Sequence, residues 1–139
     1  MCLAHQPKRR FFTGRENNMS DEVRVVVVDD HVDGAESLAE LLTLNGYCVK
    51  TAHDGTEAWA LIQVFQPLCV LFDINMPGID GAELSKRLRV TYGSEMVLIA
   101  ITGAPEDDQQ VIETFARVDY YLQKPINLAK LQVALPPLD

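Results

Sequence analysis

Residues 23–30 read VRVVVVDD, and residues 68–73 read LCVLFD. Both segments are short apolar runs that end directly on aspartate. Runs of this length and composition are typical of strands buried on both faces, as in parallel sheets. The two segments therefore predict two buried strands, with Asp29-Asp30 and Asp73 at their carboxyl ends.

Short apolar runs and longer amphipathic ones alternate along the rest of the chain. Further strands are predicted at 47–51, 96–101 and 119–122, and Pro105 is expected in the first turn of the fourth of five helices. The residues expected to face inward on the helices are Ala35, Leu38, Ala39 and Leu42; Ala58, Leu61, Ile62 and Phe65; Leu84 and Leu88; Val111, Ile112 and Phe115; and Leu128, Leu131 and Leu135. Five alternating strand–helix units predict an α/β fold: a flavodoxin-like, doubly wound, five-stranded parallel sheet in the order 2-1-3-4-5 with five helices.

The net charge of −8 is unevenly distributed. Residues 1–19 carry four cations and one acid, whereas the remainder is strongly acidic. An acidic domain repels nucleic-acid phosphates, so no direct DNA binding is expected. We interpret residues 1–20 as a disordered basic leader, with Met19 as a candidate for the natural start, and residues 21–139 as one domain.

Nothing in the sequence indicates a membrane protein or an exported one. No apolar run approaches the ~20 residues that a membrane span needs. No apolar stretch follows the basic residues of the leader, as a secretory signal would require. Three cysteines without C-x-x-C spacing argue against a zinc site and suit a reducing compartment. A cytoplasmic protein is expected.

Polar residues stand at the carboxyl ends of the predicted strands, where ligands bind in such a sheet. Asp29-Asp30 and Asp73 would converge because the first and third strands are neighbours. Carboxylates so close together stay ionised only if a cation joins them, and an all-oxygen ligand set favours Mg²⁺. Thr102 ends the fourth strand and Lys124 follows the fifth.

These residues match the needs of phosphoryl transfer. An aspartate can attack phosphorus to form an acyl phosphate, and Asp73 is the best candidate nucleophile. Lys124 and Thr102 would neutralise the oxygens of the phosphoryl group, and Asp29 with Asp30 would hold the metal.

Four separated motifs resemble those of response-regulator receiver domains of two-component signal transduction systems, in particular stand-alone, chemotaxis-regulator-like ones. They are Asp29-Asp30, DINMPGIDG at 73–81, ITG at 101–103 and YLQKP at 121–125, and GTEA at 55–58 also matches. The resemblance covers roughly residues 22–135, with every element in order.

The resemblance implies a single-domain response regulator in a phosphorelay, and not an enzyme. Asp73 would take a phosphoryl group from a phosphohistidine on a sensor histidine kinase or histidine phosphotransfer protein, and a downstream effector protein would read the result. Asp30 and Asp73 would bind Mg²⁺ by side chain, Asn75 would bind it through its backbone carbonyl, and Asp29 would act mainly through water.

The resemblance also implies a switch. Lys124 would pair with the phosphate, Thr102 would move toward it and Tyr121 would turn inward. The signal would appear on the face of the fourth helix, the fifth strand and the fifth helix. The bond between Lys124 and Pro125 is expected to be cis.

The sequence departs from the family pattern in places. Arg117 and Val118 stand where the family usually has Gly-Ala. Pro136-Pro137 ends the last helix, and no linker or output domain is expected after it. Gly103 and Ala104 are small, which predicts easy access of water to the phosphate and a short-lived acyl phosphate.

Other interpretations of the same residues stay open. A haloacid-dehalogenase-like phosphatase uses a similar set but usually needs a second aspartate at the position of Asn75. A flavodoxin would need a neutral loop where Asp29-Asp30 stand. A pseudo-receiver, which binds partner proteins without being phosphorylated, could have the same sequence pattern. His31 is expected to be an exposed loop residue at the mouth of the site, with metal ligation as the alternative.

Overall fold

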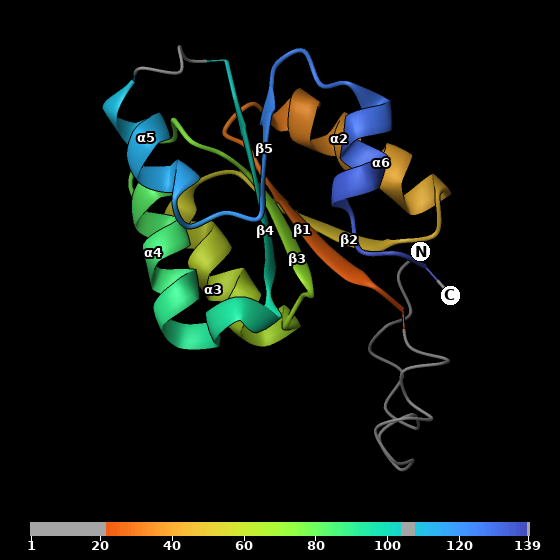
Figure 1. The fold of residues 1–139 in the computed structure, drawn as a ribbon. Helices are drawn as coiled ribbons and strands as arrows, with labels where there is room; N and C mark the ends of the chain where they lie inside the picture. The colour runs from red at the N-terminus through yellow and green to blue at the C-terminus, as the bar shows by residue number, and fades with distance from the viewer. Residues whose placement is uncertain (1–21, 104–107, 139) are drawn as a thin grey trace.

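The computed structural model describes residues 22–103 and 108–138. Its five strands form one parallel sheet in the order β2-β1-β3-β4-β5 (Figure 1). The strands are β1 (Arg24–Val28), β2 (Cys48–Ala52), β3 (Cys69–Asp73), β4 (Val97–Thr102) and β5 (Tyr120–Gln123). The predicted strands and their order are confirmed.

Helices cover both faces of this sheet. They are α2 (Val32–Leu44), α3 (Gly55–Phe65), α4 (Gly81–Tyr92), α5 (Gln109–Phe115) and α6 (Leu128–Ala134), with a 3-10 turn η2 at Gly93–Glu95. Helices α3, α4 and α5 lie on one face, and α2 and α6 on the other (Figure 1). The doubly wound architecture with five helices is therefore confirmed over the described residues.

Local sequence sets where three of the helices begin. The side chains of Asp54, Asp80 and Asn127 occupy the N-cap positions of α3, α4 and α6. Each accepts a hydrogen bond from the backbone N–H three residues later, at 2.7, 2.9 and 3.1 Å respectively. Such caps satisfy N–H groups that the helix itself leaves unpaired.

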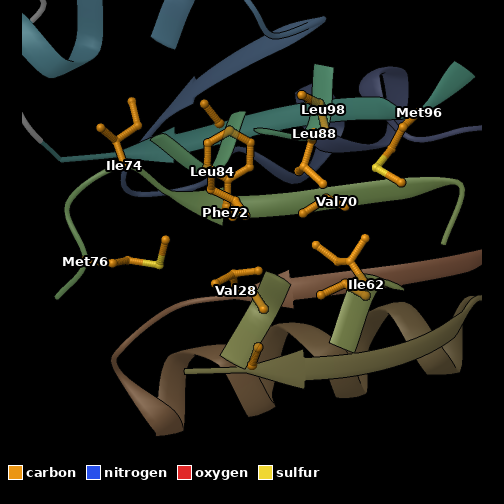
Figure 2. Close-up of a cluster of buried hydrophobic side chains, with 14 of the residues drawn as sticks. Val28, Ile62, Val70, Phe72, Ile74, Met76, Leu84, Leu88, Met96 and Leu98 are labelled. Atoms are coloured by element: carbon orange, nitrogen blue, oxygen red, sulfur yellow. The ribbon is translucent and has the colours of Figure 1, made fainter. Parts of the chain in front are cut away.

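Two apolar cores lie on opposite faces of the sheet because side chains alternate along each strand. In β1, Val26 and Val28 belong to the core under α3 and α4, whereas Val25 and Val27 belong to the core under α2 and α6. Figure 2 shows the first core, where strand residues such as Val70 and Phe72 lie among helix residues such as Leu84. Burying one such side chain fully contributes about 1.5–3 kcal/mol, which fixes the strands that carry the site.

The predicted inward faces of the last two helices are partly wrong. Val111 is buried, but Ile112 and Phe115 are 53% and 61% exposed, and Thr114 takes the second buried position. A helix of seven residues can turn only one narrow stripe inward, and residues 111 and 114 form that stripe. Leu131 of α6 and Leu135, the C-cap residue after this helix, are buried as predicted, but Leu128 opens the helix and is exposed.

Some expectations fall outside the described residues. They concern the leader at residues 1–20, Ala104 and Pro105. Over the described ranges, no helix combines the length and apolar character that a membrane crossing requires.

Candidate functional site

The three acidic side chains come together at the carboxyl edge of the sheet. Val28 of β1 pairs with Phe72 of β3, so the residues that follow, Asp29 and Asp73, emerge side by side. Asp29, Asp30, His31 and Asp73 each offer a ligand atom, and these atoms all lie within 4.8 Å of one another. The structure thus brings together the carboxylates that the sequence placed on two neighbouring strand ends.

Lys124 reaches into this acidic cluster from the end of β5. Its Nζ lies 2.8 Å from Oδ2 of Asp73 and 3.7 Å from Oδ2 of Asp29. Its backbone N–H donates to the carbonyl of Thr102 at 2.9 Å, and the peptide bond between Lys124 and Pro125 is cis, as expected. Burial lowers the pKa of Lys124, but the hydrogen bond and the charge of Asp73, with those of Asp29, outweigh this effect and raise it. The ammonium group therefore keeps its charge beside the two carboxylates.

Asp73 is the most enclosed of the three acids. It is buried in β3, and its Oδ1 accepts a hydrogen bond from the backbone N–H of Asn75 at 3.1 Å. The turn that follows is tightly packed, because a Cβ on Gly81 would lie 2.6 Å from Cα of Ile74. Glycine at position 81 therefore keeps the turn close to the strand end. Asn75 itself is exposed.

The first acid of the pair, Asp29, is held by the residue that precedes α2. The backbone N–H of His31 donates to Oδ1 of Asp29 at 3.0 Å. The N-cap of α2 is His31 and makes no side-chain cap hydrogen bond. Neither Asp29 nor Asp30 occupies the cap position, so capping does not account for the pair.

His31 lies at the mouth of the site, as expected, with its side chain 76% exposed. Its Nδ1 is 3.3 Å from Oδ1 of Asp29 and 3.3 Å from Oδ1 of Asp30. Its place beside the acidic pair is evident from the sequence, but the contact with both carboxylates appears only in the folded chain.

Thr102 and Tyr121 lie on the adjacent strands β4 and β5. Thr102 is completely buried at the end of β4. Tyr121 pairs in register with Ala100 and makes an edge-to-face contact with Phe115, with ring centroids 5.7 Å apart. Ala104, on which the expectation of a short phosphoryl lifetime partly rests, lies outside the described residues.

A cavity of about 360 Å³ opens beside these groups. Its polar lining includes Asp29, Asp73 and Lys124, and its apolar lining includes Leu38, Leu71 and Ile101. Hard divalent cations such as Mg²⁺ take oxygen ligands, and the three clustered carboxylates provide them. The residues present therefore fit a magnesium site, with room nearby for a small anionic group.

Comparisons with known proteins agree with this geometry. The model of the response regulator receiver domain family matches residues 25–136. Response regulator MprA from Mycobacterium ulcerans (strain Agy99) and its namesake from Mycobacterium tuberculosis (strain ATCC 25618 / H37Rv) are each 38% identical over 109 residues. The match covers 78% of this chain and 47% of each relative, so the chain spans about half the length of these curated relatives.

Solved structures show the same likeness. The chemotaxis response regulator CheY4 of Vibrio cholerae has 30% identity and a TM-score of 0.72, over 82% of this chain and 99% of that one. A CheY-like response regulator receiver domain protein from Methanospirillum hungatei JF-1 has 28% identity and a TM-score of 0.75. The match covers 81% of this chain and 90% of that protein. With the family match, the strand order and the acidic edge in agreement, the chain belongs to the response regulator receiver domain family of two-component signalling proteins.

Proposed function

We propose that Asp73 accepts a phosphoryl group from a phosphohistidine on a sensor histidine kinase or a histidine phosphotransfer protein. The P–N bond of the donor breaks, an O–P bond to the Asp73 carboxylate forms, and the departing imidazole takes up a proton. The observation that carries the proposal is the position of Lys124 Nζ, 2.8 Å from Asp73 Oδ2 and 3.7 Å from Asp29 Oδ2, at the edge of the acidic cluster. Phosphorylation on aspartate is typical of the family, which supports the assignment.

The proposed magnesium ligands are Asp30 and Asp73 by side chain and Asn75 through its carbonyl, with Asp29 acting mainly through water. When bound, the ion would offset negative charge on the acidic cluster and on the incoming phosphoryl oxygens. Lys124 supplies a second positive charge beside Asp73, and Thr102 supplies a hydroxyl group from the neighbouring strand end.

We also propose Thr102 and Tyr121 as the switch pair, with α5, β5 and α6 as the responding face. Phosphorylation adds charge and acceptor oxygens at the strand ends, and groups that bind them preferentially shift an existing equilibrium. Exposed apolar side chains at Ile112, Phe115 and Tyr120 give this face the surface that a downstream effector protein would contact.

The proposed role is that of a signalling module, because the product stays attached to the chain, whereas an enzyme releases its product. The rival phosphatase chemistry needs a carboxylic acid two residues after the nucleophile, and Asn75 cannot donate such a proton. We propose residues 21–139 as the receiver domain, acting in the cytoplasm without itself binding DNA. The family match over 25–136 and the acidic composition support this.

The deciding experiment is intact mass measurement after treatment with acetyl phosphate and Mg²⁺. We expect a phosphate-sized mass gain in the wild type and none in Asp73→Asn. Asp80→Asn is the matched control: it changes an acid in the same turn, keeps an N-cap residue on α4, and should gain the phosphate. No gain in the wild type would favour a pseudo-receiver. Sustained turnover of a small phosphate ester would favour the phosphatase.

A further inference from the structure

We propose that His31 is an additional metal ligand, which gives the acidic cluster a preference for borderline divalent transition-metal ions such as Co²⁺ and Zn²⁺ over Mg²⁺. The inference rests on the proposed function only in that it uses the same carboxylates. It adds a nitrogen donor that an all-oxygen magnesium site does not contain.

The geometry brings the imidazole within reach of a shared ion. Its Nδ1 lies 3.3 Å from one oxygen of Asp29 and 3.3 Å from one oxygen of Asp30. Metal–nitrogen and metal–oxygen bonds of about 2.1 Å place neighbouring ligand atoms roughly 3 Å apart. The four candidate ligand atoms, including that of Asp73, already lie within 4.8 Å of one another.

The backbone of His31 is fixed while its side chain remains free to adjust. The His31 N–H donates to Asp29 at 3.0 Å, and its carbonyl accepts from the N–H of Ala35 at 3.0 Å. The imidazole is 76% exposed and makes no cap hydrogen bond to α2. A small rotation about its side-chain bonds would therefore disturb no packed contact.

His53 provides the contrast on the next loop. Its Nδ1 lies 3.3 Å from the backbone carbonyl of Asp29, and its own N–H donates to Glu57 Oε1 at 2.7 Å. It is near the site, but it is not among the residues whose ligand atoms cluster there. His53 is therefore the matched control for a histidine that is close to the acids without binding the ion.

The chemistry of the donors explains the expected selectivity. Imidazole nitrogen suits zinc, cobalt and nickel, whereas Mg²⁺ takes oxygen ligands and keeps several waters. Loss of the imidazole should thus weaken binding of Co²⁺ and Zn²⁺ and leave Mg²⁺ almost unchanged. If His31 only forms ion pairs with the acids, its removal should change the affinity for all three ions in the same direction and to a similar extent.

The test is calorimetric titration with Co²⁺, Zn²⁺ and Mg²⁺ in one buffer, with the visible absorption of bound Co²⁺ as a second readout. We expect His31→Ala to weaken Co²⁺ and Zn²⁺ binding about tenfold or more, on the scale seen when groups around a metal site are lost, and to alter the Co²⁺ spectrum. Mg²⁺ affinity should change by less than about twofold, because Mg²⁺ takes oxygen ligands and does not depend on the imidazole. His53→Ala should leave all three ions unaffected.

The outcomes separate this inference from the proposed function. If the wild type binds Mg²⁺ and is phosphorylated, but His31→Ala leaves Co²⁺ binding and its spectrum unchanged, the inference alone is wrong. Parallel losses for Co²⁺ and Mg²⁺ would also overturn it. If the wild type binds none of the ions, the proposed magnesium site is wrong, and the role of His31 falls with it.

Discussion

Arg89 and Asp119 form a 2.8 Å ion pair at the amino-terminal edge of the sheet, opposite the edge that carries Asp73. The same Asp119 oxygen accepts the backbone N–H of Leu98 at 2.8 Å. Arg89 also donates to the carbonyls of Arg117 and Met96, both at 2.7 Å. One side chain of α4 thus ties together the segments that lead into β4 and β5.

Replacing Arg89 with alanine should lower the free energy of unfolding by about 2–3 kcal/mol, because several hydrogen bonds from one partly buried cation are lost together. Arg87→Ala is the control on the same helix. It breaks an exposed 3.0 Å pair with Glu83 and a ring contact with Trp59, and should cost less than about 1 kcal/mol. Urea unfolding at neutral pH measures the free energy of unfolding of both variants. Equal decreases in the two variants would contradict the role of Arg89 in holding these segments together.

Gly55→Ala should destabilise the protein through a backbone collision. A Cβ at this position would lie 1.8 Å from the carbonyl oxygen of Ile79, so the start of α3 and the turn after β3 would have to separate. Forcing an extra methyl group into such a contact costs about 1–3 kcal/mol.

The matched control is Gly34→Ala within α2, where the nearest atoms to a new Cβ are 3.8 Å away. There the substitution should stabilise the protein by about 0.5–1 kcal/mol, since glycine weakens a helix interior. Thermal unfolding should show opposite signs for the two variants. If the melting temperatures of both variants shift in the same direction, steric contact with Ile79 does not explain why residue 55 is glycine.

Lys124→Met should tighten Mg²⁺ binding while it lowers the yield of phosphorylation. The ammonium group, whose pKa is raised on balance by Asp73 and Asp29, is charged at neutral pH and repels an incoming cation. At about 4 Å in a water-like medium this repulsion is about 1 kcal/mol, which corresponds to roughly a fivefold change in affinity. Calorimetric titration measures the affinity, and Lys130→Met, on an exposed turn of α6, is the control. Weaker Mg²⁺ binding in Lys124→Met would contradict the electrostatic model.

The buried thiol of Cys69 should make stability fall at alkaline pH. Burial, with a smaller effect from Asp119, raises the pKa of Cys69. The folded protein therefore keeps this proton, while the unfolded chain releases it near pH ~8.5. Since the unfolded state then binds fewer protons, the free energy of unfolding decreases with rising pH, by up to about 1.4 kcal/mol per pH unit.

Cys69→Ala should be less stable than the wild type at pH 7, and the difference should narrow as the pH rises above ~8.5. Val70→Ala, at an equally buried position of β3, should show a difference that does not vary with pH. Urea unfolding at several pH values between 7 and 10 provides the comparison. If the free energies of unfolding of the wild type and Cys69→Ala change with pH in parallel, the thiol of Cys69 does not titrate differently in the folded and unfolded states.

Much of the fold was readable from the sequence because its signals are local. The run VVVV at 25–28 is buried on both faces because α-helices cover both sides of β1. The caps at Asp54, Asp80 and Asn127 were not among the sequence predictions, although their hydrogen bonds span only three residues. The carboxylates converge because they follow adjacent parallel strands, a consequence of topology that the alternation of elements predicts.

By itself, then, the sequence determined the elements, because these depend on periodicity within short windows. It also determined the strand order and the edge that carries the acids, because these follow from the alternation of strands and helices. Only the tertiary structure decided the rotation of α5, which leaves Phe115 outside, and the contacts of Arg89 with Asp119 and of Gly55 with Ile79. Such contacts join residues 24 to 30 positions apart. They depend on how each helix is turned and placed on the sheet, and no local pattern of side chains encodes that.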